Sequence, residues 1–441
     1  MKFQAKLIPA TLSAVKNPIF LLTNSLLLAT LSNAAGFEKN ILWSGKYQGR
    51  AGAATSSVKD SEALFFNPAG LTGVANADVR VNFSPTFSNF KGPTFAPNTT
   101  NTDNDTQSTG TAFSPVGALT SAYRMNDDLV LGLGAFVSGG TNAIYNDVAA
   151  GGGVGKSESK LTLLDFALGA AYKINEEFSI GASWKATYAS AALASMSGTT
   201  GAANPTALLE FTDLKDWNFL GFRVGAQYLT ENFGLGLNVR TPVKLDLNGK
   251  GKISALAAPA VNGTDDDLNI SAEFPTQIAF GGHAKLNNAW TLFVDASWTN
   301  YGRVDRLDIE SFNVSGPLAA NAAAANLGDI QTKWLDQQVV RIGTEWAAAP
   351  NLALRAGYAL ISQTTPNDFA KATFSSPGLG HTFTVGAGTT LFGLEVDGAV
   401  DYSFASGKVD STTSHLANGG SVAGKYSSHS YTAHIGVAKN F

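Results

Sequence analysis

The feature that most constrains the fold is a series of short segments in which apolar and polar residues alternate. In the first of them, Val79, Val81 and Phe83 are separated by Arg80 and Asn82. Successive side chains of a strand point to opposite faces, so each segment predicts a β-strand with one apolar and one polar face. About thirteen further segments follow, near residues 119–125, 129–137, 164–174, 178–188, 220–228, 233–239, 274–280, 290–298, 340–346, 352–360, 383–387, 394–404 and 431–437.

The connections between these segments are of two kinds. Short turns rich in Asn, Asp and Glu alternate with long polar loops near residues 88–113, 140–159, 190–213, 248–273, 304–333, 364–380 and 405–427. An even strand number, with short turns at one end and long loops at the other, is typical of bacterial outer-membrane barrels. We therefore predict an all-β fold, a 14-stranded antiparallel transmembrane β-barrel in the Gram-negative cell outer membrane. A soluble all-β protein is the alternative.

The end of the chain and its composition agree with this prediction. Phe441 closes an alternating strand, which resembles the insertion signal read by the barrel-assembly machinery. The chain has 15% charged residues and no cysteine, so disulfides and thiolate metal sites are excluded. Scattered charges with an acidic balance argue against nucleic-acid binding. The five histidines form neither a nucleophile elbow nor a zinc motif, so we expect no enzyme, metal or cofactor.

Two further segments precede the first strand. Residues 1–34 combine three lysines, an apolar run and Ser32-Asn33-Ala34, as in a signal peptide. Residues 35–75 are rich in small residues and show no alternation, so we predict a hatch that plugs the lumen of a barrel formed by residues 76–441. A plug of this size argues against a general diffusion porin. An adhesin or purely structural barrel is a further alternative.

The polar face of each strand would face the lumen. It carries charges of both signs, including Arg341, Arg355, Lys244 and Asp246, which either pair with each other or include a carboxylate site. Strand 129–137 and its continuation contain four glycines, which predict a kink with a lateral opening, or reflect ordinary glycine use; these are Gly132, Gly134, Gly139 and Gly140.

Two of the long loops contain apolar residues. The stretch 191–211 includes Leu193, Met196 and Phe211, and 253–261 is similar. Exposed apolar side chains predict either packing between loops or a landing surface for a hydrophobic ligand.

Several motifs resemble the long-chain fatty acid transporter family of the Gram-negative outer membrane, which includes aromatic-hydrocarbon uptake proteins. The similarity covers the mature chain and is carried by Ala35-Gly36-Phe37, Gly49-Arg50-Ala51-Gly52-Ala53-Ala54, Asp60, Asn67-Pro68-Ala69-Gly70-Leu71, Phe274-Pro275, Trp298-Thr299-Asn300-Tyr301, Trp334-Leu335-Asp336 and Arg355-Ala356-Gly357-Tyr358.

The resemblance implies passive uptake of hydrophobic compounds, most of all long-chain fatty acids, with capture by extracellular loops, a pocket gated by the hatch and lateral exit through the wall. Phe37 would lie near the ligand, and Asn67, Pro68 and Ala69 would face the wall. Lys333 lies near the position of a basic residue that contacts the carboxylate. No motif selects fatty acid over aromatic hydrocarbon. The expected partners are this hydrophobic small molecule, outer-membrane lipids and lipopolysaccharide, around a monomeric barrel.

Overall fold

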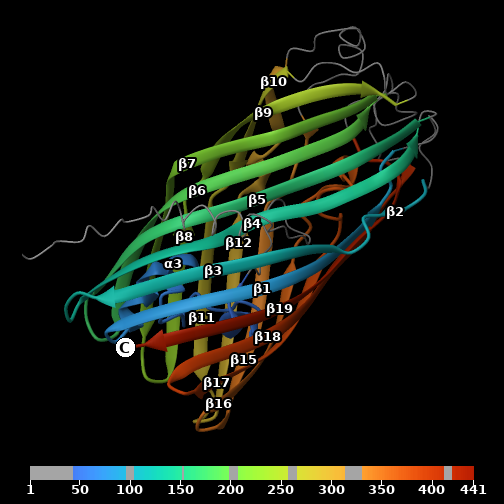
Figure 1. Cartoon of the computed structure of the whole chain (residues 1–441). Helices are drawn as coiled ribbons and strands as arrows, with labels where there is room; N and C mark the ends of the chain where they lie inside the picture. The colour runs from blue at the N-terminus through green and yellow to red at the C-terminus, as the bar shows by residue number, and fades with distance from the viewer. Residues whose placement is uncertain are drawn as a thin grey trace, which may run out of the picture.

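The computed structural model describes residues 43–95, 104–150, 153–197, 207–256, 266–312, 330–411 and 420–441. The predicted signal peptide and Phe37 lie outside these ranges. The described strands form one closed antiparallel sheet, because the first barrel strand pairs with the last, from Asp78 opposite Asn440 to Lys91 opposite Ser427. The strands are strongly tilted, with short turns at one end and long connections at the other (Figure 1). No helix in these ranges is long and apolar enough to cross a membrane.

Fourteen barrel strands arise from the nineteen hydrogen-bonded segments in the described ranges, because several are halves of one interrupted strand. The uninterrupted ones are β1 (Ala77–Gly92), β3 (Ala112–Arg124), β4 (Leu129–Ala150), β5 (Gly153–Lys173), β6 (Phe178–Ser197), β7 (Ala207–Leu229), β16 (Leu352–Ile361), β17 (Gly380–Leu391), β18 (Leu394–Val409) and β19 (Gly424–Asn440). The interrupted ones are β8 (Phe233–Arg240) with β9 (Val243–Ala255), β10 (Asp266–Phe274) with β11 (Gln277–Lys285), β12 (Trp290–Thr299) with β13 (Arg306–Phe312), and β14 (Ile330–Gln331) with β15 (Gln337–Ala349). The short β2 (Gln107–Ser108) extends the β1 ladder. The predicted fold class is confirmed.

The interruptions in the β8/β9 and β10/β11 strands lie at Pro242 and Pro275, where no backbone N–H is available for the ladder. Beyond Pro242 the inward face changes parity, since Leu245 is buried while Lys244 and Asp246 are exposed and paired with each other. The prediction that these two charges face the lumen is therefore wrong. The prediction assumed that the alternation continues through Pro242, but the strand breaks there and its inward and outward positions exchange.

Toward the short turns most of the predicted faces are correct, although Val137, which the alternation places on the lipid side, is buried. Apolar side chains such as Phe83, Leu133 and Val385 are about half exposed on the outside, as a lipid-facing surface requires. Polar side chains such as Arg80 and Asp165 are buried on the inside.

The inside of the barrel is filled by residues 43–74. They contain α2 (Gly45–Gln48), α3 (Ala63–Phe66) and the 3₁₀ helix η1 (Pro68–Gly73). We call residues 43–74 the hatch; Figure 1 shows α3 within the barrel, near the end with the short turns. Two further 3₁₀ turns, η2 (Tyr301–Arg303) and η3 (Asn367–Phe369), lie in the connections.

The hatch lies against cross-strand pairs of glycine. The wall places Gly132 opposite Gly169, Gly181 opposite Gly225, Gly236 opposite Gly281, and Gly343 opposite Gly357. A Cβ atom at Gly225 would overlap the side chain of Asn67, and one at Gly343 would lie 2.6 Å from the Cβ of Arg50. The hatch backbone can approach the wall this closely only because these wall positions lack side chains.

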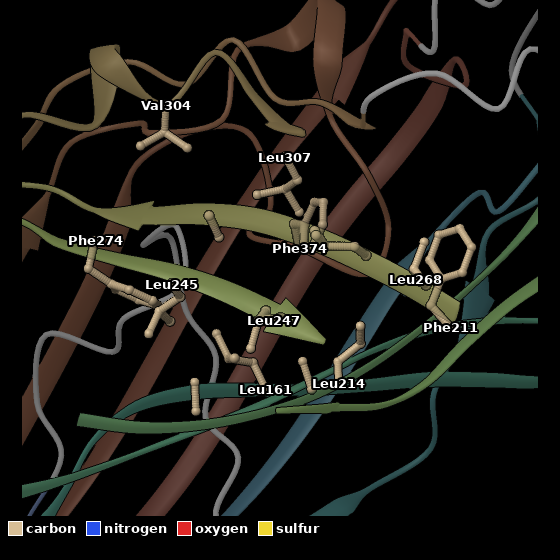
Figure 2. Close-up of a cluster of buried hydrophobic side chains, with 14 of the residues drawn as sticks. Leu161, Phe211, Leu214, Leu245, Leu247, Leu268, Phe274, Val304, Leu307 and Phe374 are labelled. Carbon is tan, nitrogen blue, oxygen red and sulfur yellow. The ribbon is translucent and has the colours of Figure 1, made fainter. Parts of the chain in front are cut away.

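The end of the barrel with the long connections has its own hydrophobic core. Residues of β5, β7, β9, β10 and the following loops turn apolar side chains inward, as Figure 2 shows for Leu161, Leu245 and Phe274. Leu307 of β13, and Val304 and Phe374 from connections, belong to the same cluster. The changes of parity at Pro242 and Pro275 turn apolar side chains of β9 and β10 into this interior, which lies above a polar lumen.

Candidate functional site: a lumenal pocket between the hatch and the wall

The Asn67-Pro68-Ala69 segment anchors the hatch to the wall. The Asn67 amide nitrogen donates to the carbonyl oxygens of Thr55, at 2.8 Å, and Ala226, at 3.1 Å. Its side-chain oxygen accepts from the Ala69 amide at 3.2 Å, which caps η1, and Pro68 occupies the first turn of that helix. Such capping satisfies N–H groups that have no partner within the helix. Through the bond to Ala226 this element contacts β7 of the wall.

A second anchor comes from the wall. Asp295 on β12 accepts hydrogen bonds from the backbone amides of Ala54 and Thr55 at 3.0 and 2.9 Å. Arg50 lies over the ring of Phe293 at 3.8 Å, a cation–π arrangement. These contacts hold the middle of the hatch against the strands opposite η1.

A third anchor is an ionic network where the barrel closes. Asp60 accepts from Tyr47 at 2.7 Å and from Lys46 at 3.2 Å, and lies 3.5 Å from Arg80 of β1. Arg80 and Lys46 also contact Glu395 of β18, at 2.9 and 3.7 Å. Burial raises the pKa of Asp60, but the two cations outweigh it and leave the pKa at about 2. Asp60 is therefore ionised in the docked hatch.

Glu62 is the opposite case, and its raised pKa predicts that hatch docking depends on pH. Burial, reinforced by Asp60, raises the pKa of Glu62 from 4.5 to about 7, although Asn82 donates to it at 2.9 Å. A carboxyl group whose pKa is raised on docking takes up a proton between pH 4.5 and 7, so docking weakens as the pH rises through that window. We expect a protease to cut the hatch of the folded protein faster at pH 8 than at pH 5.5.

The Glu62→Gln variant tests this expectation, since its neutral side chain has nearly the same shape. The dependence on pH should be lost, with slow cleavage at both pH values. Glu177→Gln, in an exposed turn, is the control and should behave as the original protein. An unchanged pH profile in Glu62→Gln would assign the effect to another group.

A cavity of about 70 Å³ lies between the hatch and the wall. Its apolar side is formed by Phe65 and Phe66 of α3, and Ser138 of β4 reaches it. The other side carries four cationic side chains, which are Lys185 of β6, Arg223 of β7, Arg240 of β8 and Arg341 of β15. We call this cavity the lumenal pocket.

Among the described residues that line the lumenal pocket, four are cationic and one, Asp295, is a carboxylate. Asp295 accepts hydrogen bonds from the hatch amides, and Lys185 is paired with Asp165. Arg223 also lies over the ring of Phe65 at 5.4 Å, so cationic and aromatic surfaces meet in the pocket. An anionic group attached to an apolar chain matches both surfaces.

The wall beside the lumenal pocket is interrupted. The β3–β4 ladder ends where Ala118 is opposite Phe136, although β3 remains paired with β1 as far as Ala112. On its other side β4 stays paired with β5, but its register shifts between Val137 and Gly139. Ser138 is thus the extra residue of a β-bulge, and Gly140 follows with a φ of 157°. We call this place the β3–β4 gap.

The hatch contacts the wall at the β3–β4 gap. The Trp43 indole N–H donates to the Val137 carbonyl at 2.9 Å, next to the bulge. The Trp43 ring lies 5.4 Å from Phe136 and 5.1 Å from Phe65, and Phe65 lies 5.5 Å from Phe136. This aromatic cluster therefore links the lumenal pocket, which Phe65 lines, to the gap. Sequence reasoning missed Trp43 and Phe65, because isolated aromatics in a segment without periodicity carry no signal of what they face.

The four glycines predicted to kink the strand divide into two pairs. Gly139 and Gly140 flank or follow the bulge. Gly132 and Gly134 keep regular pairing with both neighbours. A Cβ at either would lie 3.0–3.2 Å from the nearest side-chain atoms, those of Leu64 among them. They provide room for the hatch.

The three predicted basic residues lie in different environments. Arg341 lines the lumenal pocket and donates to Ser297 at 3.1 Å. Arg355 is instead held between Glu345 and Asp397, each at 2.6 Å, as in a structural ion pair. Lys333 is in an extracellular connection, 3.4 Å from Asp305 and 42% exposed.

Among the predicted loop residues, Leu193 and Phe211 belong to the apolar cluster of Figure 2, and Met196 belongs to a separate cluster with Phe90 and Tyr145.

One arrangement within the wall has the form of a catalytic triad. Ser84 contacts His434 at 2.8 Å, and His434 contacts Asp401 at 2.7 Å. All three are buried, and Ser84 has no exposed surface, so a substrate cannot reach the hydroxyl. The arrangement is a buried hydrogen-bond chain that joins β1, β19 and β18.

A closed barrel with an apolar outer face, an internal hatch and a small lumenal pocket defines an outer-membrane transport channel. The chain belongs to the outer membrane protein transport family (OMPP1/FadL/TodX), whose family model matches residues 25–441. It is a transport protein of the outer membrane and not a member of an enzyme family.

Known relatives cover most of the chain. It is 23% identical over 414 residues to a long-chain fatty acid transport protein of Salmonella typhi, with 85% of this chain and 88% of the relative covered. Similar solved structures include a Pseudomonas aeruginosa FadL homologue (TM-score 0.76, 16% identity, 92% of this chain and 100% of that chain) and the toluene transporter TodX of P. putida (TM-score 0.72, 17% identity, 91% and 99%). At these identities the structural likeness establishes the fold.

Proposed function

We propose that this protein carries hydrophobic compounds with an anionic head group, most of all long-chain fatty acids, passively across the outer membrane. The observation that supports this substrate class is the lumenal pocket, where four cationic side chains and the rings of Phe65 and Phe66 line one cavity. Arginine and lysine side chains bind carboxylates through charge-assisted hydrogen bonds. A fatty carboxylate supplies the charge, and its chain contacts the rings.

The proposed route has three steps. The apolar cluster at the extracellular end receives the chain, and Leu193 and Phe211 belong to it. The lumenal pocket then holds the carboxylate beside Arg223 and Arg341. The ligand leaves through the β3–β4 gap into the membrane when Trp43 and Phe65 move with the hatch. In this proposal Phe37, which precedes Trp43, belongs to the moving end.

The second candidate substrate is a neutral aromatic hydrocarbon. The cluster of Trp43, Phe65, Phe66 and Phe136 favours it, because ring contacts at 5.1–6.1 Å suit an aromatic guest. Binding of oleate and of toluene to the purified protein separates the two candidates. Tighter binding of oleate than of its methyl ester supports the acid, and binding of toluene with no preference for the acid supports the hydrocarbon.

Deletion of Ser138 tests the route through the wall. Removing the extra residue of the bulge restores a continuous β4–β5 register, so the gap should close. We expect uptake of the labelled substrate by whole cells to fall at least tenfold, while binding to the purified protein falls much less, since the cationic side chains and the rings of the pocket remain. Deletion of Asp147, beside the second register shift of β4 at Tyr145–Val148, serves as the control. Unchanged uptake after deletion of Ser138 would place the exit elsewhere.

A further inference from the structure

The lipid-facing surface carries a continuous row of aromatic side chains. Six residues on six adjacent strands are directly paired across the ladders, in the order Tyr358, Phe383, Tyr402, Tyr431, Phe87 and Phe113. Neighbouring rings in the row lie close together, for example Tyr402 and Tyr431 at 4.8 Å and Phe87 and Phe113 at 5.3 Å. The row crosses the seam between β1 and β19. We call it the aromatic row.

Toward the short turns, the aromatic row borders a hollow. The next outward position on the central strands is small or β-branched, with Ala356, Val385, Val400 and Ala433 in direct register. The step down from rings to these short side chains leaves an open apolar hollow of about 670 Å³. An acyl chain fits such a surface, because it requires apolar contacts and no hydrogen bonds.

Toward the long loops, the same sector becomes polar and then cationic. Lys91 follows Phe87 by four residues on β1, about 14 Å at roughly 3.4 Å per residue. Lys408 and Lys425 are directly opposite each other on β18 and β19. All three are exposed on the outer surface. Two like charges in direct register destabilise a sheet unless an anion lies between them.

Few acidic residues of the described ranges lie near these lysines. Asp410 lies 3.6 Å from Lys408, and Asp105 is exposed two residues before β2. No ion pair links Lys91 or Lys425 to a residue in the described ranges. A comparable outer sector on β7, β9 and β10 differs, because Lys215, Lys244 and Lys250 each pair with an aspartate, at 3.4, 3.2 and 2.6 Å. The cationic charge of the β1, β18 and β19 sector is therefore the less compensated of the two.

We propose that this sector of the outer wall is a specific binding site for lipopolysaccharide, with an acyl chain in the hollow and the lipid A phosphates at the lysines. The order of apolar hollow, aromatic row and lysines matches the order of chain, interface and head group in a lipid. The lysines lie at the long-loop end, which faces the outer leaflet, where phosphorylated glycolipid is the abundant lipid. Lysine ammonium groups and phosphates attract each other and form charge-assisted hydrogen bonds.

Native mass spectrometry of the purified full-length protein, after addition of bisphosphorylated lipid A, tests the proposal. The original protein should retain one lipid A molecule in preference to phosphatidylethanolamine. The triple variant Lys91→Ser, Lys408→Ser, Lys425→Ser should lose at least tenfold in lipid A affinity. The matched control, Lys215→Ser, Lys244→Ser, Lys250→Ser, changes the net charge equally and should bind as the original protein does.

Two further measurements make the outcome decisive. Val400→Trp with Ala433→Trp fills the hollow without a charge change and should also weaken binding, provided the unheated gel shows the folded band. Lipid A without phosphates should bind no better than phosphatidylethanolamine. Equal losses in both lysine triples, or equal binding of dephosphorylated lipid A, would overturn the proposal. Because ligand uptake is not the readout, failure here leaves the proposed transport function unaffected.

Discussion

Replacing Gly236 with valine should release the hatch from an otherwise intact barrel. The new Cβ would meet the backbone of Thr55 and lie 2.7 Å from the Cα of Ser56, so the middle of the hatch could not dock. Overpacking of this kind costs about 1–3 kcal/mol or more, and the wall cannot yield, since Gly236 is held in register with Gly281 and Gln227. The folded band on an unheated gel should persist, because the β-propensity of valine favours the strand.

The released hatch should be seen in two ways. Trypsin should cut after Lys46, Arg50 or Lys59 at least tenfold faster than in the original protein, and cells should admit large antibiotics. Gly282→Val is the matched control, since its Cβ would have 3.6 Å to the nearest atom and points to the lipid side. A protected hatch in Gly236→Val, with a folded barrel, would show that the wall adapts and that close approach is not required.

Replacing Arg223 with methionine should weaken binding of a fatty carboxylate and spare its methyl ester. Methionine keeps an apolar stem over the ring of Phe65 and removes only the charge. A hydrogen bond to a charged group contributes about 1.5–3 kcal/mol, so the dissociation constant for oleate should rise roughly 10- to 100-fold. Binding can be followed by displacement of a fluorescent fatty acid from the purified protein.

Three comparisons decide what the loss means. Arg223→Lys should restore most of the affinity, because it restores the charge. Arg303→Met removes an exposed arginine that pairs with Glu273 at 3.6 Å, and it should have no effect. Equal weakening of oleate and its methyl ester in Arg223→Met would indicate a distorted pocket, and would remove the carboxylate from the proposed role of Arg223.

The sequence was sufficient to predict the barrel, because a lipid-facing strand must alternate at every second residue. That signal failed at Pro242, where the strand breaks and the apolar face turns inward. The hatch could be located but not its contacts, since Trp43 and Phe65 acquire their roles only from the strand they face. The sequence does not distinguish Arg341 from Arg355, since each stands on the polar face of a predicted strand. Only the positions of Glu345 and Asp397 show that Arg355 is already neutralised.

The ionic network around Asp60 has a consequence for the order of assembly. Arg80 belongs to the first strand and Glu395 to the thirteenth, and the hatch backbone at Gly45 contacts Asn82 and packs beside Gly436 of the last strand. These partners come together only when the sheet has closed, so the N-terminal segment, although synthesised first, reaches its place last. Before closure its binding surface on the wall is incomplete. Once docked, it contacts both sides of the β1–β19 seam, so the segment that blocks the lumen also stabilises the closed sheet.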